Sequence, residues 1–265
     1  MSAVDRHAPD GTCFAVHGEG RPLVLLHGLG LDRGMWDEQV AALAGSCMTI
    51  TIDALGHGAS PSPPKALKLQ HFVDQVTVVL DELKIERAVV AGFDLGGQVT
   101  LALAARASQR VAGTVLISTA YRRLKAQRDM LLTRIDQARR HGPVANADSA
   151  IQRWFSATFQ GDERERVQAI RQRLASNEPA GYIAASELYA RADVETAEDV
   201  KRIVSPMLVL CGALDAGSTP AMARRLVGAV ASAKLVIVPR QGHMLPIEAA
   251  GTVSSALRAF MSALN

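Results

Sequence analysis

The chain has 265 residues, of which 48% are hydrophobic, enough for one large core or two small domains. The 29 Lys and Arg residues nearly balance the 26 Asp and Glu residues, so no nucleic-acid partner is expected. Residues 1–11 are polar, and no apolar run approaches the ~20 residues that cross a bilayer, so neither a signal peptide nor a membrane partner is expected. The three cysteines, Cys13, Cys47 and Cys211, lie in or beside apolar stretches without CxxC spacing. This usage favours buried thiols in a reducing, cytoplasmic setting.

Short apolar runs alternate with helical patterns along most of the chain. Continuous apolar strands joined by helical crossovers predict an α/β fold with a parallel sheet that helices cover on both faces. Chemistry in such sheets gathers at the carboxyl ends of the strands. In chain order, strands are predicted at 23–26, 48–52, 88–92, 111–117, 207–210 and 234–238, and helices at 36–44, 69–83, 95–107, 220–231 and 247–264.

Residues 121–205 interrupt this alternation. The segment is helical in pattern, rich in Arg and Ala, and has no convincing strand. It predicts a helical lid over the carboxyl edge of the sheet, inserted between core segments 1–120 and 206–265. No repeat or flexible linker is visible, so lid and core are expected to form one compact unit. Trp154, Tyr182 and Tyr189 make the lid a candidate substrate-binding surface.

The lid is also basic. Its cations could attract an acidic substrate, but Asp129 and Asp136 lie among them, which favours an ordinary solvated helix face. The basic residues are Arg122, Arg123, Lys125, Arg128, Arg134, Arg139 and Arg140.

The strongest functional signal is the run Gly92-Phe-Asp-Leu-Gly96, where a buried strand passes into a helix. Small residues two places before and after the centre allow a sharp strand-to-helix turn that lifts Asp94 out of the sheet. The helix N-terminus favours an anion there, which suits a carboxylate nucleophile. Alternatively, Asp94 is simply the N-cap of the helix.

Two further runs precede this turn: His27-Gly28 after a strand, and Asp53-Ala-Leu-Gly-His-Gly-Ala-Ser60. Together with the turn at Gly92–Gly96, they resemble the α/β-hydrolase superfamily over nearly the whole chain. The resemblance implies an oxyanion hole formed by the backbone N–H groups of Leu29 and Leu95. It also makes Gly28 a candidate substrate contact, while His27 and His57 are expected to organise loops.

A third signal lies near the end of the chain. Asp215 follows the strand at 207–210, and His243 follows the strand at 234–238. The superfamily order is nucleophile, acid, histidine, which Asp94, Asp215 and His243 match. The resemblance therefore implies that His243 is the catalytic base and that Asp215 fixes its tautomer.

An aspartate where most relatives carry serine changes the expected chemistry. A carboxyl with an ordinary pKa near ~4 is already ionised at neutral pH, so His243 would instead activate water against an ester on Asp94. A carboxylate displaces well at saturated carbon but acylates poorly, because attack on an acyl group gives a mixed anhydride. The aspartate is either a natural variant or a replacement of serine, and the sequence leaves both open.

Outside Asp94, the chain most resembles the esterase, lactonase and enol-lactonase branch, so a small ester or lactone is the leading substrate class. Epoxide hydrolysis through an alkyl-enzyme ester is an alternative, with Tyr182 or Tyr189 as the acid, although their seven-residue spacing favours plain core packing. Halide release is disfavoured, because Leu29 and Leu95 have no side-chain N–H donors. A lyase with Asp94 as base, and a disabled ligand-binding homologue, also remain open. No cofactor or metal motif is present, and the oligomeric state is not indicated.

Overall fold

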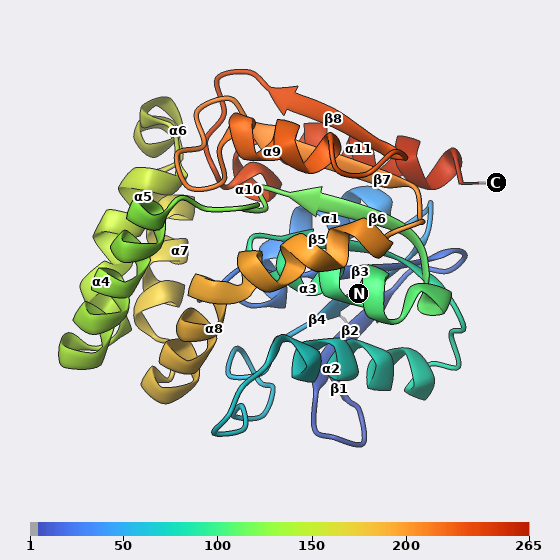
Figure 1. Cartoon of the computed structure of the whole chain (residues 1–265), viewed down its shortest axis with the longest axis horizontal. Helices are drawn as coiled ribbons and strands as arrows, with labels where there is room; N and C mark the ends of the chain where they lie inside the picture. The colour runs from blue at the N-terminus through green and yellow to red at the C-terminus, as the bar shows by residue number, and fades with distance from the viewer. Residues whose placement is uncertain (1–4, 265) are drawn as a thin grey trace.

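A twisted eight-stranded sheet organises the molecule, for which a computed structural model describes residues 5–264 (Figure 1). The strand order is β1-β2-β4-β3-β5-β6-β7-β8. All neighbours from β4 to β8 run parallel, whereas β1–β2 and β2–β4 are antiparallel. The predicted α/β class and mostly parallel sheet are therefore confirmed. The strands are β1 (Arg6–His7), β2 (Cys13–His17), β3 (Pro22–Leu26), β4 (Met48–Ile52), β5 (Ala88–Phe93), β6 (Val111–Ile117), β7 (Met207–Gly212) and β8 (Ala233–Val238).

The six predicted strands are all present, with ends within two residues of the prediction. The antiparallel strands β1 and β2 are absent from the prediction. A two-residue strand and a five-residue run that ends in a histidine carry too little periodicity to be recognised.

The sheet divides the core into two layers, because successive side chains of a strand point to opposite faces. Val24 and Leu26 of β3 pack with helices α2 and α3, whereas Leu23 and Leu25 pack with α1 and α11. Full burial on both faces explains the continuous apolar runs of the central strands.

The helices of the core cover these two faces (Figure 1). The predicted helix at 36–44 begins as a 3-10 turn, and the predicted helix at 247–264 is interrupted at Ala249, which has φ −132°. The core helices are η1 (Arg33–Trp36), α1 (Asp37–Leu43), α2 (Leu69–Glu82), α3 (Leu95–Arg106), η2 (Ser108–Arg110), α9 (Pro220–Val227), α10 (Leu245–Glu248) and α11 (Ala250–Ser262).

Residues 121–205, called the inserted helices below, lie between β6 and β7 and gather at one end of the sheet (Figure 1). They contain helices alone, in line with the pattern of the sequence. They are α4 (Lys125–His141), η3 (Pro143–Asn146), α5 (Ala147–Trp154), α6 (Ala157–Asp162), α7 (Arg164–Ala175), α8 (Pro179–Asp199) and η4 (Val200–Arg202). None of the helices between residues 5 and 264 combines the length and apolar character that crossing a membrane requires.

Candidate active site

Asp94 lies in the sharp turn between β5 and α3. Its backbone has φ 52° and ψ −107°, a strained conformation that L residues rarely adopt. The flanking glycines make the turn feasible: a Cβ on Gly92 would lie 2.1 Å from the Gly96 carbonyl oxygen, and one on Gly96 would lie 2.3 Å from the Leu26 carbonyl oxygen. The turn accordingly holds Asp94 at the carboxyl edge of the sheet as the glycine spacing predicts, and its side chain forms no N-cap hydrogen bond.

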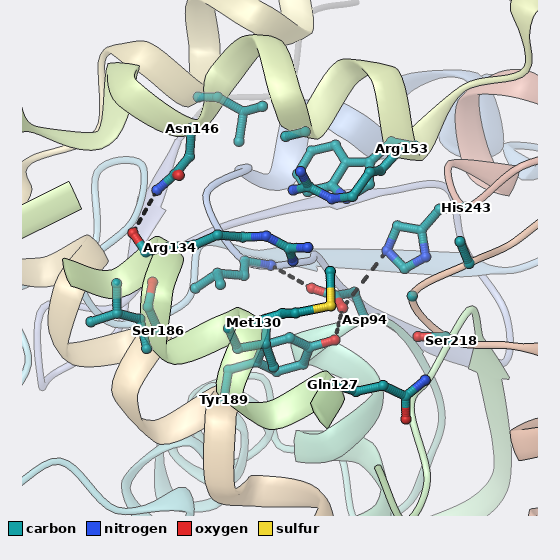
Figure 2. A pocket seen from close by; sticks show the side chains of 18 of the residues that line it. Asp94, Gln127, Met130, Arg134, Asn146, Arg153, Ser186, Tyr189, Ser218 and His243 are labelled. Atoms are coloured by element: carbon teal, nitrogen blue, oxygen red, sulfur yellow. Dashed lines mark hydrogen bonds and ion pairs between the residues drawn. The ribbon is translucent and has the colours of Figure 1, made fainter. Parts of the chain in front are cut away.

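The Asp94 carboxylate is almost fully buried and contacts a different partner on each oxygen (Figure 2). Oδ2 accepts the backbone N–H of Leu29 at 3.2 Å. Oδ1 accepts a short hydrogen bond from the hydroxyl of Tyr189 and lies 3.7 Å from Nε2 of His243. The two oxygens are therefore inequivalent: one faces a backbone donor and the other faces the side chains of the cavity.

His243 lies between the two aspartates. Its Nδ1 is 2.8 Å from Oδ2 of Asp215, while Oδ1 of Asp215 accepts the backbone N–H groups of Gly217 and Ser218, each at 2.8 Å. The loop that carries His243 is anchored by its backbone N–H, which donates to the Trp154 carbonyl at 2.8 Å. The structure thus brings together Asp94, His243 and Asp215, which are remote in sequence.

The net effect of burial and neighbouring charges is to raise the pKa of both His243 and Tyr189. Burial opposes protonation of His243, but the charge and hydrogen bond of Asp215, together with the charge of Asp94, raise the pKa of His243 above its ordinary value. Burial, and then the charge of Asp94, raise the pKa of Tyr189 well above its ordinary value. Tyr189 is therefore a neutral hydroxyl donor at physiological pH.

The loop and helix residues assigned to the oxyanion hole lie on either side of Asp94. The N–H of Leu29 points at the carboxylate, and Leu95 is the first residue of α3. Gly28 lies beneath the site rather than along the cavity, and a Cβ there would lie 2.6 Å from the Phe93 ring. Its role is thus close packing under Asp94.

A cavity of about 200 Å³ opens over Asp94 and His243, between the sheet edge and the inserted helices (Figure 2). Trp154, Tyr182 and Tyr189, the aromatic candidates from the sequence, all line it. The Tyr189 hydroxyl donates a hydrogen bond to Asp94, whereas among residues 5–264 no hydrogen bond joins Tyr182 to Asp94. Seven-residue spacing therefore placed both rings on the cavity side of α8.

His27 and His57 organise loops, as expected. Nε2 of His27 accepts the Ala54 N–H at 2.9 Å, and Nε2 of His57 accepts the Gly30 N–H at 2.9 Å. Burial lowers the pKa of His57 to about 3, so its ring is neutral at physiological pH. Neither ring lines the cavity.

The prediction that the basic residues form one solvated helix face is wrong for two of them. Arg123 is buried, pairs with Asp193 at 3.1 Å, and stacks over the Tyr189 ring at 4.1 Å. Arg134 is partly buried and lines the cavity. The remaining residues are exposed or only partly covered, because helix α4 turns a single side toward the sheet edge.

Five polar residues of the cavity wall were not singled out by the sequence: Gln127, Asn146, Arg153, Ser186 and Ser218. No local signal marks them, since Asn146 and Arg153 reach the cavity only through the packing of η3 against α4 and of α5 against η3. Ser218 could have been found from its loop, three residues after Asp215 and at the carboxyl edge of the sheet. Among residues 5–264, no group of three or more His, Cys, Asp or Glu side chains is arranged to hold a metal ion.

Comparison with known proteins gives one consistent relationship. A sequence profile described as the alpha/beta hydrolase family matches residues 23–256. The 3-oxoadipate enol-lactonase 2 of Acinetobacter baylyi is 29% identical over 254 residues, covering 95% of this chain and 93% of that protein.

Solved structures agree with that relationship. The enol-lactonase from Burkholderia xenovorans LB400 superimposes with a TM-score of 0.89 at 30% identity, covering 98% of this chain and 100% of that one. A thermophilic esterase from Thermogutta terrifontis has a TM-score of 0.89 at 26% identity, covering 100% of this chain and 99% of that one.

Proposed function

The chain belongs to the alpha/beta hydrolase family, and on that premise we propose that it hydrolyses a small carboxylic ester or lactone through an ester formed on Asp94. One observation carries the proposal: the Asp94 carboxylate presents Oδ1 to the cavity beside His243, while Oδ2 accepts the Leu29 N–H. Similarity to an esterase and to enol-lactonases supports esters and lactones in general, and the route below restricts the proposal to those whose ester oxygen is bonded to a saturated carbon. The inserted helices would serve as the lid, and the three buried free thiols fit a cytoplasmic setting.

In the first step, Oδ1 of Asp94 attacks the saturated carbon bonded to the ester oxygen. The carbon–oxygen bond breaks, and its electron pair leaves with the substrate carboxylate, so no proton is needed. When the substrate is a lactone, the ring opens and the whole chain stays attached to Asp94 through its alkyl carbon. This route requires a saturated carbon, because displacement from behind is blocked at the vinylic carbon of an enol ester.

In the second step, Nε2 of His243 takes a proton from water, and the resulting hydroxide attacks the carbonyl carbon of the Asp94 ester. Oδ2 carries the developing negative charge, where the Leu29 N–H already donates and the Leu95 N–H would join it. The alkoxide leaves and takes the proton from His243. Asp94 is regenerated with one oxygen from water, and Asp215 steadies the imidazolium meanwhile.

Turnover in water labelled with heavy oxygen tests these two reaction steps directly. After a few turnovers in labelled water, the peptide that contains Asp94 is expected to gain the label, measured by mass spectrometry. A peptide without Asp94 from the same digest serves as the control. Product formation without label in Asp94 would exclude the covalent route and favour Asp94 as a general base.

The Asp94→Ser variant tests the surrounding machinery. If the Leu29 N–H, His243 and Asp215 are arranged for ester hydrolysis, a serine at the turn should give measurable activity on a simple aryl ester. Tight ligand binding by the wild type with no product over hours would instead support a disabled binding protein.

Epoxide hydrolysis is a second candidate, which the hydroxyl of Tyr189 on Oδ1 of Asp94 favours. An opening epoxide releases an alkoxide that needs a proton, and Tyr189 is a neutral donor at that place. The Tyr189→Phe variant separates the candidates. It should lower epoxide turnover about 100-fold or more, yet leave the alkylation step of a lactone largely intact, because a carboxylate leaves without a proton.

A further inference from the structure

Two arginines of the inserted helices reach the cavity without a carboxylate partner. Arg134 extends from α4 and Arg153 from α5, and both are partly buried (Figure 2). Neither guanidinium has an acidic side chain close enough to affect it among residues 5–264. By contrast, the third arginine of the wall, Arg123, is neutralised by Asp193.

The two cations also disfavour each other. Burial, and then the charge of Arg134, lower the pKa of Arg153 to about 10, and burial lowers the pKa of Arg134. Both nevertheless stay charged at neutral pH. Placing two like charges, each partly buried, in one small cavity costs free energy, which a bound anion would recover.

Other polar atoms of the wall lack partners as well. Oδ1 of Asn146 and Oγ of Ser218 belong to residues of the cavity wall, are buried, and have no hydrogen-bond partner in the described part of the chain. The Asn146 amide donates instead to the carbonyl of Arg134 at 2.8 Å, which ties η3 to the helix that carries this arginine. Hydrogen bonds therefore fix the cavity wall in place, yet some of its polar atoms have no hydrogen-bond partner within the described residues.

We propose that Arg134 and Arg153 bind a carboxylate of the substrate, so that the enzyme acts on a small ester, lactone or epoxide that carries a separate acid group. The inference rests on the proposed function for the reacting end of the substrate, at Asp94. With Arg123 paired to Asp193, the unpaired formal charges of the lining are those of Arg134, Arg153 and Asp94, which sum to +1, so a monoanionic substrate brings the total to zero. The planar guanidinium suits the two oxygens of a carboxylate.

Binding of a ring ketone tests the inference without turnover, since cyclopentanone carboxylate has no bond to hydrolyse. Isothermal titration of the wild-type protein should show saturable binding of this carboxylate. Its neutral carboxamide should bind about tenfold more weakly or worse. Equal binding of the two, or no saturable binding of the carboxylate, would overturn the proposal. So would inorganic phosphate binding as tightly as the carboxylate.

Variants test whether Arg134 and Arg153 cause the preference for the carboxylate over the carboxamide. Arg134→Gln and Arg153→Gln should each weaken carboxylate binding about tenfold while leaving the carboxamide unchanged. Arg153→Lys, which keeps the charge, should recover part of the loss. The matched control is Arg140→Gln, because Arg140 lies on α4 like Arg134 but is exposed and outside the cavity. An equal loss in the control would show a mere effect of net charge.

A failure of the carboxylate-binding proposal can be distinguished from a failure of the covalent mechanism. The Asp94→Asn variant should lose turnover, yet bind the carboxylate as tightly as the wild type or more tightly, because one negative charge leaves the cavity. Label in Asp94 with no preference for carboxylates would keep the mechanism and contradict the arginine site.

Discussion

The sheet edge and the inserted helices contribute to the same cavity in different ways. At the sheet edge, Asp94 and Asp215 each accept backbone N–H groups and face His243, so every charge has a partner. The inserted helices contribute one fully paired cation, Arg123, and two without acidic partners, Arg134 and Arg153. Under the proposed function, the sheet edge would supply the reacting groups, and the two arginines of the inserted helices would gain an anionic partner only from the substrate.

The largest effect is expected at the sheet edge, in Asp215→Asn. If Asp215 orients His243, kcat should fall about 10⁴-fold. The acid limb of the pH–rate profile should move too. The base must be neutral, and the pKa of His243 is raised in the wild type. The wild-type kcat should therefore rise with pH, and the pH at which it is half-maximal should lie above the ordinary pKa of histidine.

Removing the negative charge of Asp215 lowers that pKa, so the midpoint for residual activity should shift to lower pH. A pH profile of kcat at saturating substrate measures this. An unchanged midpoint in the variant would show that Asp215 does not set the protonation of His243.

Among the inserted helices, the largest effect is expected from the buried pair of Arg123 and Asp193. The two side chains are 3% and 0% exposed, so Asp193→Asn leaves a cation buried without its counter-ion. The free energy of unfolding should fall by about 3–5 kcal/mol in urea titrations.

The matched control is Asp129→Asn, which breaks the exposed pair with Lys125 on α4 and should change stability very little. An equal loss of stability in both variants would contradict the expectation that the buried pair of Arg123 and Asp193 contributes more to stability than the exposed pair of Lys125 and Asp129.

A smaller loss is expected in the turn that carries Asp94. Gly92→Ala places a Cβ 2.1 Å from a backbone oxygen that has little freedom to move. We expect about 3 kcal/mol of destabilisation by chemical denaturation, since the strand and helix must separate to admit the methyl group.

Gly251→Ala provides the control, because Gly251 lies in α11 and a Cβ there meets no atom within 4 Å. This change should stabilise the protein by about 0.5 kcal/mol through helix propensity. A Gly92→Ala protein as stable as the wild type would mean that the turn is not the rigid part of the site.

The sequence by itself determined the parallel sheet and the three side chains at its edge. Those signals are local: apolar runs give the strands, glycines at fixed spacing give the turn at Asp94, and strand ends give the places of Asp215 and His243. Whatever follows a parallel strand must lie at the carboxyl edge of the sheet, so local patterns suffice to gather them.

Only the tertiary structure decided what faces them across the cavity. Arg123, Arg134 and Arg140 belong to one basic stretch, yet one is buried in an ion pair, one lines the cavity and one is exposed. Their places depend on how α4 packs against η3 and α8. Such packing depends on contacts between residues far apart in the chain, which periodicity within one helix cannot specify.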